Sequence, residues 1–233
     1  MTYPDKTNKV TEMKRKTWIL LMAMILSIGL QAQEKLQDPE VKKIIDAFGE
    51  KMKKNSPIKV DFTYSYESLQ TDDNFEEKGT IVIDDKKYKL EVMEAKIYFD
   101  GETMWNYLPE VDEVNITEPD PSANDEFLSN PASFFQVYNK DFKYRLLGTK
   151  TFNNKTFYEI DLYPIDLEKD YSRVKLLIEK DNLQLYSAQI FFKSGDIYTL
   201  QVNDIESRFD APDNFYKFDI DAHPDADVID MRF

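Results

Sequence analysis

Residues 58–67, which read IKVDFTYSYE, show the pattern that most of the chain then repeats. Apolar and aromatic side chains, from Ile58 to Tyr66, alternate with polar ones without a break. Successive side chains of a β-strand point to opposite sides, so one side of this segment is apolar and the other is polar. The pattern predicts a strand that packs on a core with one face and meets water with the other.

Segments of the same kind follow this first strand and are joined by short polar turns such as Asn153-Asn154 and Asp181-Asn182. The predicted strands are 79–84, 86–93, 96–99, 103–108, 111–116, 142–149, 155–163, 172–179, 183–193 and 196–207. Consecutive strands with such turns form an antiparallel meander. We therefore expect a mainly β (α+β) fold in which about ten to eleven strands form a large curved sheet or barrel.

A helix is predicted before the first strand. Asp38 is suited to cap it, Pro39 to its first position, and Asn55-Ser56-Pro57 to its end. Its apolar residues recur at helical spacing and form one stripe: Val41, Ile44, Ile45, Phe48 and Met52. A single stripe of this kind is typical of a helix that packs on the core of its domain.

Residues 119–139, PDPSANDEFLSNPASFFQVYN, interrupt the meander with three prolines and no alternation. Apolar side chains within it favour one or two short helices. A helical interruption of a meander is well placed to cover an open face of the sheet. We interpret Leu128, Phe134 and Phe135 as candidate lid residues of such a cover.

The amino terminus has the order of a secretory signal peptide. A basic cluster at residues 14–16 precedes an apolar run at 18–30, and Ala32 closes a small-residue cleavage site. We predict that residues 1–32 are cleaved and that translation starts at Met13. An uncleaved signal anchor is the alternative, although the run is short for a span of about 20 apolar residues.

Composition limits the classes of function. The chain holds one His, no Cys, 16 Phe, 14 Tyr and 2 Trp, so it has few of the side chains used in nucleophilic, acid–base and transition-metal chemistry. The net charge is −14, and it becomes −17 without residues 1–32. Nucleic acid is thus not an expected partner, and neither disulfides nor a cofactor nor a resident metal is expected. We predict a binding protein, not an enzyme.

Two further patterns give weaker chemical signals. His223 is surrounded by alternate aspartates in DIDAHPDAD (residues 219–227), but EF-hand spacing and a second histidine for zinc are both missing. An exposed tail strand is the preferred interpretation of this stretch. The number of acidic residues does not exclude a pair of carboxylates of the glycosidase type, but the sequence singles out no two of them.

Residues 100–109, DGETMWNYLP, form the most specific motif, a tight turn into a strand with Trp105 and Tyr107 on one face. Flanking pieces stand in a fixed order around it: Phe62-Thr63, 79–83, Asn130-Pro131, 158–164 and the stretch from Phe218 to Val228. In this order the chain resembles the LolA family, periplasmic carriers of lipoproteins between the inner and outer membranes of Gram-negative bacteria. The resemblance spans roughly residues 38–230, and the style of the leader suits a Bacteroidetes member.

The resemblance implies a single half-barrel domain over residues 33–233, an unclosed antiparallel β-barrel with a helical lid that encloses a hydrophobic cavity. It implies a periplasmic monomer that binds lipoprotein acyl chains, takes lipoproteins from an inner-membrane ABC transporter and delivers them to an outer-membrane acceptor. Better-studied relatives hold the lid with an arginine after the second strand. Residues 84–87 read DDKK here, so we assign that role to no residue.

Aromatic and branched side chains of the early strands are the candidate cavity lining, because alternation places them on shared faces. They are Phe62, Tyr64, Ile81, Ile83, Tyr88, Leu90, Val92, Ile97, Phe99, Trp105 and Tyr107. Two other functions stay open. One is a periplasmic sensor of lipid or lipoprotein on the same fold, and the other is a secreted glycan-active β-protein.

Overall fold

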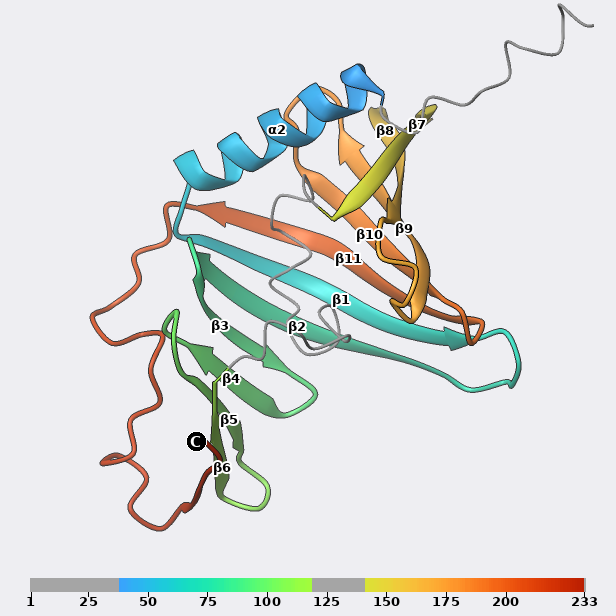
Figure 1. Cartoon of the computed structure of the whole chain (residues 1–233). Helices are drawn as coiled ribbons and strands as arrows, with labels where there is room; N and C mark the ends of the chain where they lie inside the picture. The colour runs from blue at the N-terminus through green and yellow to red at the C-terminus, as the bar shows by residue number, and fades with distance from the viewer. Residues whose placement is uncertain (1–37, 119–140, 233) are drawn as a thin grey trace, which may run out of the picture. The chain divides into compact units, whose positions relative to one another are not determined.

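A twelve-stranded sheet forms the body of the computed structural model, which describes residues 38–118 and 141–232 (Figure 1). The elements in chain order are α2 (Pro39–Lys54), β1 (Ile58–Ser68), β2 (Asn74–Asp84), β3 (Lys87–Val92), β4 (Ala95–Phe99), β5 (Met104–Leu108), β6 (Glu113–Thr117), β7 (Phe142–Phe152), β8 (Lys155–Pro164), β9 (Tyr171–Glu179), β10 (Leu185–Phe192), β11 (Asp196–Ser207) and β12 (Asp227–Asp230).

The strand order is β12-β6-β5-β4-β3-β2-β1-β11-β10-β9-β8-β7, so β12 and β7 are the edge strands of the described sheet. Two meanders, β1–β6 and β7–β11, are joined where β1 pairs with β11. Every neighbouring pair is antiparallel except β12 and β6, which are parallel. The expected mainly β, unclosed antiparallel architecture is confirmed.

The additional strand is β12. The sequence predicts an exposed tail strand near His223 and no partner for it, but residues 227–230 pair with Glu113–Ile116 of β6. The strand is short and acidic, and its pairing partner lies far back in the sequence, so no local pattern indicates the pairing. Its side chains are exposed, as expected for an edge strand.

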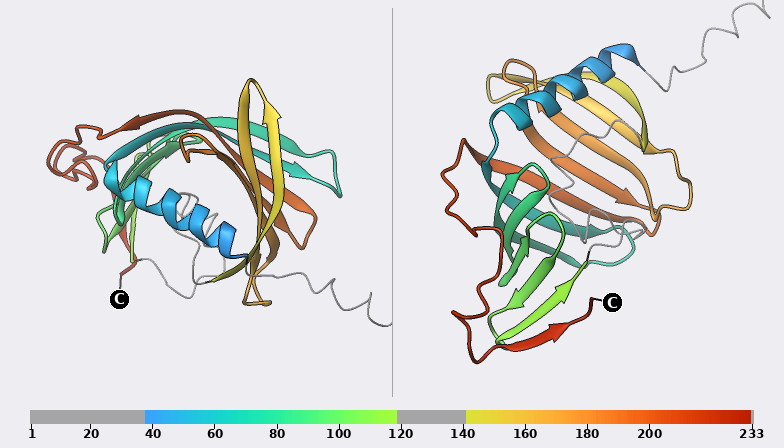
Figure 2. Two further views of the ribbon diagram at one scale, coloured as in Figure 1. Left: turned by 90° about the horizontal axis from the view of Figure 1, so that it is seen from above. Right: turned by 60° about the vertical axis from the view of Figure 1, so that its left-hand side comes forward.

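Helix α2 begins where the sequence predicted. The carboxylate of Asp38 accepts a hydrogen bond from the backbone N–H of Glu40 at 2.9 Å, and Pro39 occupies the first turn. Val41, Ile45 and Phe48 on its apolar stripe are fully buried. The sheet curves around the helix, as the view from above shows (Figure 2). We call the side of the sheet that carries α2 the inner face, and the opposite side the outer face.

The main core lies between α2 and the inner face. Its buried members come from α2, from β1–β3 and from β7–β11, and they are all apolar or aromatic. Among the largest fully buried side chains are those of Ile81, Leu90, Ile160 and Leu176. Burying a branched side chain of this size contributes about 1.5–3 kcal/mol, so this layer holds the two meanders together.

A second, smaller cluster lies on the outer face of β4–β6. Phe218, from the segment between β11 and β12, packs on Tyr107 with ring centroids 4.8 Å apart and on Tyr98 at 5.8 Å. The His223 ring lies 5.0 Å from that of Tyr107 and 4.6 Å from that of Phe218. Residues 208–226 therefore cover the outer face of these strands, and His223 is part of that packing and not of a freely solvated tail.

Several sequence predictions fall outside the described residues. These are the signal peptide over 1–32, the start at Met13, and the lid candidates Leu128, Phe134 and Phe135. Within residues 38–118 and 141–232, no helix has the length and apolar character needed to cross a bilayer.

Candidate functional site

The inner face gathers most of the residues that the sequence proposed as a binding surface. Five of them are buried in the main core: Phe62, Ile81, Ile83, Tyr88 and Leu90. Four more pack against it and are half-buried: Tyr64, Val92, Ile97 and Phe99. The register explains the grouping, because residues directly opposite in neighbouring strands share a face, as Ile81 and Leu90 or Leu90 and Ile97 do. The structure thus brings nine of the eleven predicted residues together.

Trp105 and Tyr107 lie elsewhere. Tyr98 pairs with Trp105 and Lys96 pairs with Tyr107, so these side chains share the outer face, while Ile97 and Phe99 face inward. Both belong to the second cluster, under Phe218. Trp105 and Tyr107 therefore pack the C-terminal segment onto the sheet, whereas Met104 of the same motif faces inward and accepts a hydrogen bond of 3.6 Å from the Tyr88 hydroxyl.

Half of the inner face carries a chain of aromatic rings that we call the aromatic belt. It consists of Phe75 (β2), Tyr66 (β1), Tyr198 (β11), Phe192 (β10), Tyr171 (β9) and Phe142 (β7), and each ring lies 5.0–6.2 Å from the next. Tyr64 contacts both Phe75 and Tyr198. The belt lies toward the strand ends that are remote from the junction of α2 with β1. It extends the apolar surface from one meander to the other.

Three tyrosines of this face, Tyr64, Tyr88 and Tyr198, have pKa values above the ordinary value. Burial raises the pKa of Tyr88 to about 12. Burial, together with the neighbouring Tyr198, raises the pKa of Tyr64 well above its ordinary value of about 10. Burial also raises the pKa of Tyr198. A phenol that cannot ionise presents an apolar ring with a hydroxyl at its end, and such rings suit contact with hydrocarbon.

The cavity lining predicted from the sequence includes none of the belt residues, but it includes Tyr64, which contacts the belt. Tyr66 stands in the alternation of residues 58–67, and that signal could have found it. Tyr198, Phe192 and Tyr171 could not have been found in this way. Their proximity to Tyr66 depends on the pairing of β1 with β11, which joins distant parts of the sequence.

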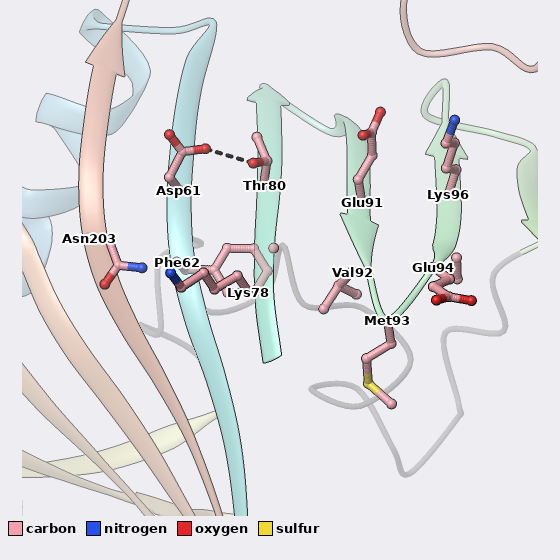
Figure 3. A pocket seen from close by; sticks show the side chains of 12 residues that line it. Asp61, Phe62, Lys78, Thr80, Glu91, Val92, Met93, Glu94, Lys96 and Asn203 are labelled. Atoms are coloured by element: carbon pink, nitrogen blue, oxygen red, sulfur yellow. Dashed lines mark hydrogen bonds between the residues drawn. The ribbon is translucent and has the colours of Figure 1, made fainter. Parts of the chain in front are cut away.

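A groove of about 440 Å³ lies at the tip of the β3–β4 hairpin (Figure 3). Its lining is mostly polar and includes Asp61, Lys78, Glu91, Lys96 and Asn203. The Asp61 carboxylate accepts a hydrogen bond of 2.6 Å from the Thr80 hydroxyl (dashed line in Figure 3). Because both signs of charge line it, the groove has no strong preference for an anion or a cation, and it differs in kind from the aromatic belt.

No catalytic or metal-binding arrangement stands out in the described part of the chain. Among the described residues, no three or more His, Asp or Glu side chains are grouped so that they could hold a metal ion. The Nδ1 atom of His223 lies 2.9 Å from the backbone carbonyl oxygen of Asp219, and its ring is packed between aromatic neighbours.

One family model matches the chain, over residues 92–212, which is just over half of its length. Its description reads "Uncharacterized protein". The chain belongs to this family of uncharacterized proteins. The family region runs from the end of β3 to the segment that follows β11, so it includes part of the first meander and all of the second. No curated protein matches the chain.

A solved structure shows the same fold. An uncharacterized conserved protein from Thermus thermophilus matches with a TM-score of 0.56 and 11% identity, over 82% of this chain and 99% of that chain. At that identity the likeness shows the fold alone. A LolA superfamily protein from Nitrosomonas europaea matches with a TM-score of 0.42, 14% identity, 76% of this chain and 97% of that chain. The Mycobacterium tuberculosis lipoprotein LppX matches with a TM-score of 0.43, 10% identity, 71% of this chain and 95% of that chain.

Proposed function

We propose that the inner face binds the acyl chains of lipoproteins and that the protein carries lipoproteins through the periplasm. The observation that supports this is the continuous apolar surface formed by the half-buried side chains of β1, β3 and β4 together with the aromatic belt. Hydrocarbon is the ligand chemistry that such a surface favours, because it offers large apolar contact with neutral rings.

The free energy of burying acyl chains restricts how much of the ligand the protein can enclose. Burying one methylene contributes about 0.8 kcal/mol, so one sixteen-carbon chain would contribute about 12 kcal/mol and three chains about 36 kcal/mol. Non-covalent affinities saturate near about 18–21 kcal/mol. Because a carrier must also release its cargo, either part of the lipid stays outside, or apolar contacts within the protein must be broken to admit it.

The remainder of the proposal follows the resemblance in sequence. The chain is a LolA-type carrier of the Bacteroidetes kind that is exported through its signal peptide, acts as a monomer and performs no catalysis. It receives lipoproteins from an inner-membrane ABC transporter. Its acidic surface, at a net charge of −14, disfavours adhesion to anionic lipid between the two membranes.

The binding step is tested by native mass spectrometry of the protein purified without detergent, followed by lipid extraction and by titration with a fluorescent triacylated peptide. Ile97→Glu puts a charge on the half-buried inner face and should abolish uptake. Ile197→Glu is the matched control, because Ile197 is also half-buried but pairs with Phe191 on the outer face. Failure of the wild-type protein to take up the peptide, or equal losses in the two variants, would contradict the proposal.

Transport, as opposed to sensing, needs a second measurement. A carrier loaded with the labelled peptide should pass it to outer-membrane vesicles, and the label should leave the protein fraction as vesicles are added. A sensor on the same fold would keep the label at every vesicle concentration. Retention with intact binding would therefore reject the carrier role and leave the binding step standing.

A further inference from the structure

The outer face of β7–β9 carries a group of charged side chains that the function proposed above does not use. Its cations are Lys143, Arg145, Lys150, Lys155, Arg173 and Lys175, and its acids are Glu159, Asp161 and Glu179. The register places them together, because Asp161 of β8 stands opposite Arg145 on one side and Lys175 on the other. We call this group the cationic face.

The three carboxylates lie beneath the cations. Only 2% of the Asp161 side chain, 11% of that of Glu159 and 12% of that of Glu179 is exposed. Oε1 of Glu159 lies 2.8 Å from Nζ of Lys150 and 2.6 Å from Nζ of Lys175. Burial alone would raise the pKa of Glu159, but the hydrogen-bonded ammonium groups of these lysines lower it, so the carboxylate is ionised.

The carboxylate of Asp161 also contacts a cation. Its Oδ2 atom lies 3.3 Å from NH1 of Arg173 and accepts a hydrogen bond of 3.2 Å from the Tyr163 hydroxyl. The Arg173 guanidinium carbon also lies 4.0 Å from the centre of the Phe191 ring. A carboxylate below and an aromatic ring beside it fix the guanidinium in place, so part of the cost of ordering it for a ligand is already met by the fold.

Several of these cations meet solvent, whereas the side chain of Lys175 is only 19% exposed. The side chains of Lys150 and Lys155 are 53% and 54% exposed, and that of Arg173 is 32% exposed. An ammonium group has three donors, and the contacts to Glu159 leave donors of Lys150 directed at solvent. With six cations over three acids, the face has a net charge of about +3 in a chain of −14.

We propose that the cationic face is a docking surface for an acidic segment of a partner protein. Carboxylates of an extended segment would accept hydrogen bonds from the solvent-facing donors of Lys150, Lys155 and Arg173 and add a second acidic layer above the cations. A protein segment suits the surface better than an anionic membrane does. A segment meets the face alone, whereas a bilayer would also meet the acidic remainder of the molecule and be repelled by it.

The test uses a fluorescein-labelled decaglutamate peptide and fluorescence anisotropy at low and high salt. The double variant Lys150→Gln/Lys155→Gln removes two exposed cations of the face. Lys86→Gln/Lys87→Gln removes two exposed lysines from the β2–β3 turn and is the matched control for net charge. We expect the first variant to weaken peptide binding about fivefold and the control less than about twofold, with all binding weakened by salt.

Three outcomes would overturn the proposal: no decaglutamate binding by the wild-type protein, equal losses in the two variants, or binding of phosphatidylglycerol vesicles in place of the peptide. The last would assign the face to anionic lipid. Thermal unfolding checks that the variants are folded. If loss of the Glu159 contact unfolds the first variant, Lys143→Gln/Lys155→Gln leaves that contact intact and should show the same fivefold weakening.

Discussion

The ring of Phe62 occupies the space that a side chain on Gly79 would need. The two residues stand opposite each other on β1 and β2, and a Cβ atom on Gly79 would lie 2.5 Å from Cζ of Phe62 and 2.9 Å from the backbone oxygen of Glu91. Phe62 is one of the largest fully buried side chains of the main core. A glycine on β2 is therefore required by the packing of the inner face.

Gly79→Ala is expected to lower the free energy of unfolding by about 1–3 kcal/mol, because the added methyl group displaces a packed ring. Urea denaturation measures this. In the double variant Gly79→Ala/Phe62→Leu, the shorter side chain leaves room for the methyl group. The two substitutions should therefore cost at least about 0.5 kcal/mol less together than the sum of their separate effects. Strict additivity would show that the ring is not the obstacle.

Glu159→Gln should destabilise the protein in a pH-dependent way. The pKa of Glu159 is lowered in the folded state, so its ionised form adds stability above the ordinary carboxyl pKa of about 4.3, and this stability is lost as pH falls through the lowered folded value. We expect a loss of about 1–3 kcal/mol at pH 7 that shrinks toward about pH 3.

Glu179→Gln is the comparison for that measurement, because Glu179 contacts one exposed lysine, Lys155, at 2.9 Å. Its loss should be smaller, about 1 kcal/mol, because one contact to a solvent-exposed ammonium group is lost in place of two contacts. Equal losses of unfolding free energy in the two variants at pH 7 would show that the second lysine contact of Glu159 adds no stability.

Alkaline titration should separate buried from exposed tyrosines. Burial raises the pKa of Tyr88 to about 12, so the folded state holds this proton more tightly than the unfolded state. The stability linked to it is complete below the unfolded value of about 10 and is lost as pH rises from there. Tyr88→Phe should remove one late-titrating group from the tyrosinate absorbance and flatten the fall in stability. An unchanged titration curve would contradict the burial of this phenol.

Phe218→Ala should loosen the C-terminal segment from the sheet. Phe218 is buried between Tyr98, Tyr107 and His223, so its removal should lower the local free energy of opening by about 3 kcal/mol. Hydrogen exchange of the β12 amides reports this opening. Phe215→Ala, at a half-buried position of the same segment, should have a smaller effect. Equal exchange rates in both variants would mean that Phe218 does not anchor the segment.

Alternation along the chain was enough to predict which residues of one strand share a face, as for Ile81 and Ile83 or for Tyr88 and Leu90. Alternation alone did not predict that Trp105 lies on the outer face. Both faces of β5 carry large side chains, because residues 208–226 cover the outer one. A local pattern does not reveal that a distant segment buries the second face.

The burial of the acids in the cationic face likewise could not be predicted from the sequence of a single strand. In Tyr158-Glu159-Ile160-Asp161-Leu162, the period places both acids outward, and outward-facing acids are normally solvated. Their burial depends on the long side chains of β7 and β9, for example Lys150 and Lys175, which fold over them from neighbouring strands. The register between neighbouring strands decides whether these acids are buried, so the sequence of one strand does not predict it.

The pairing of β1 with β11 has a consequence for how the protein forms. Each meander consists of hairpins between successive strands, but residues 58–68 find their second partner only at 196–207. Contacts of such long sequence separation form slowly, because the loop between them must be closed first. Until residues 196–207 are available, one edge of β1 lacks its hydrogen-bonding partner. An unpaired strand edge can pair with another chain, so aggregation competes with folding until β1 meets β11.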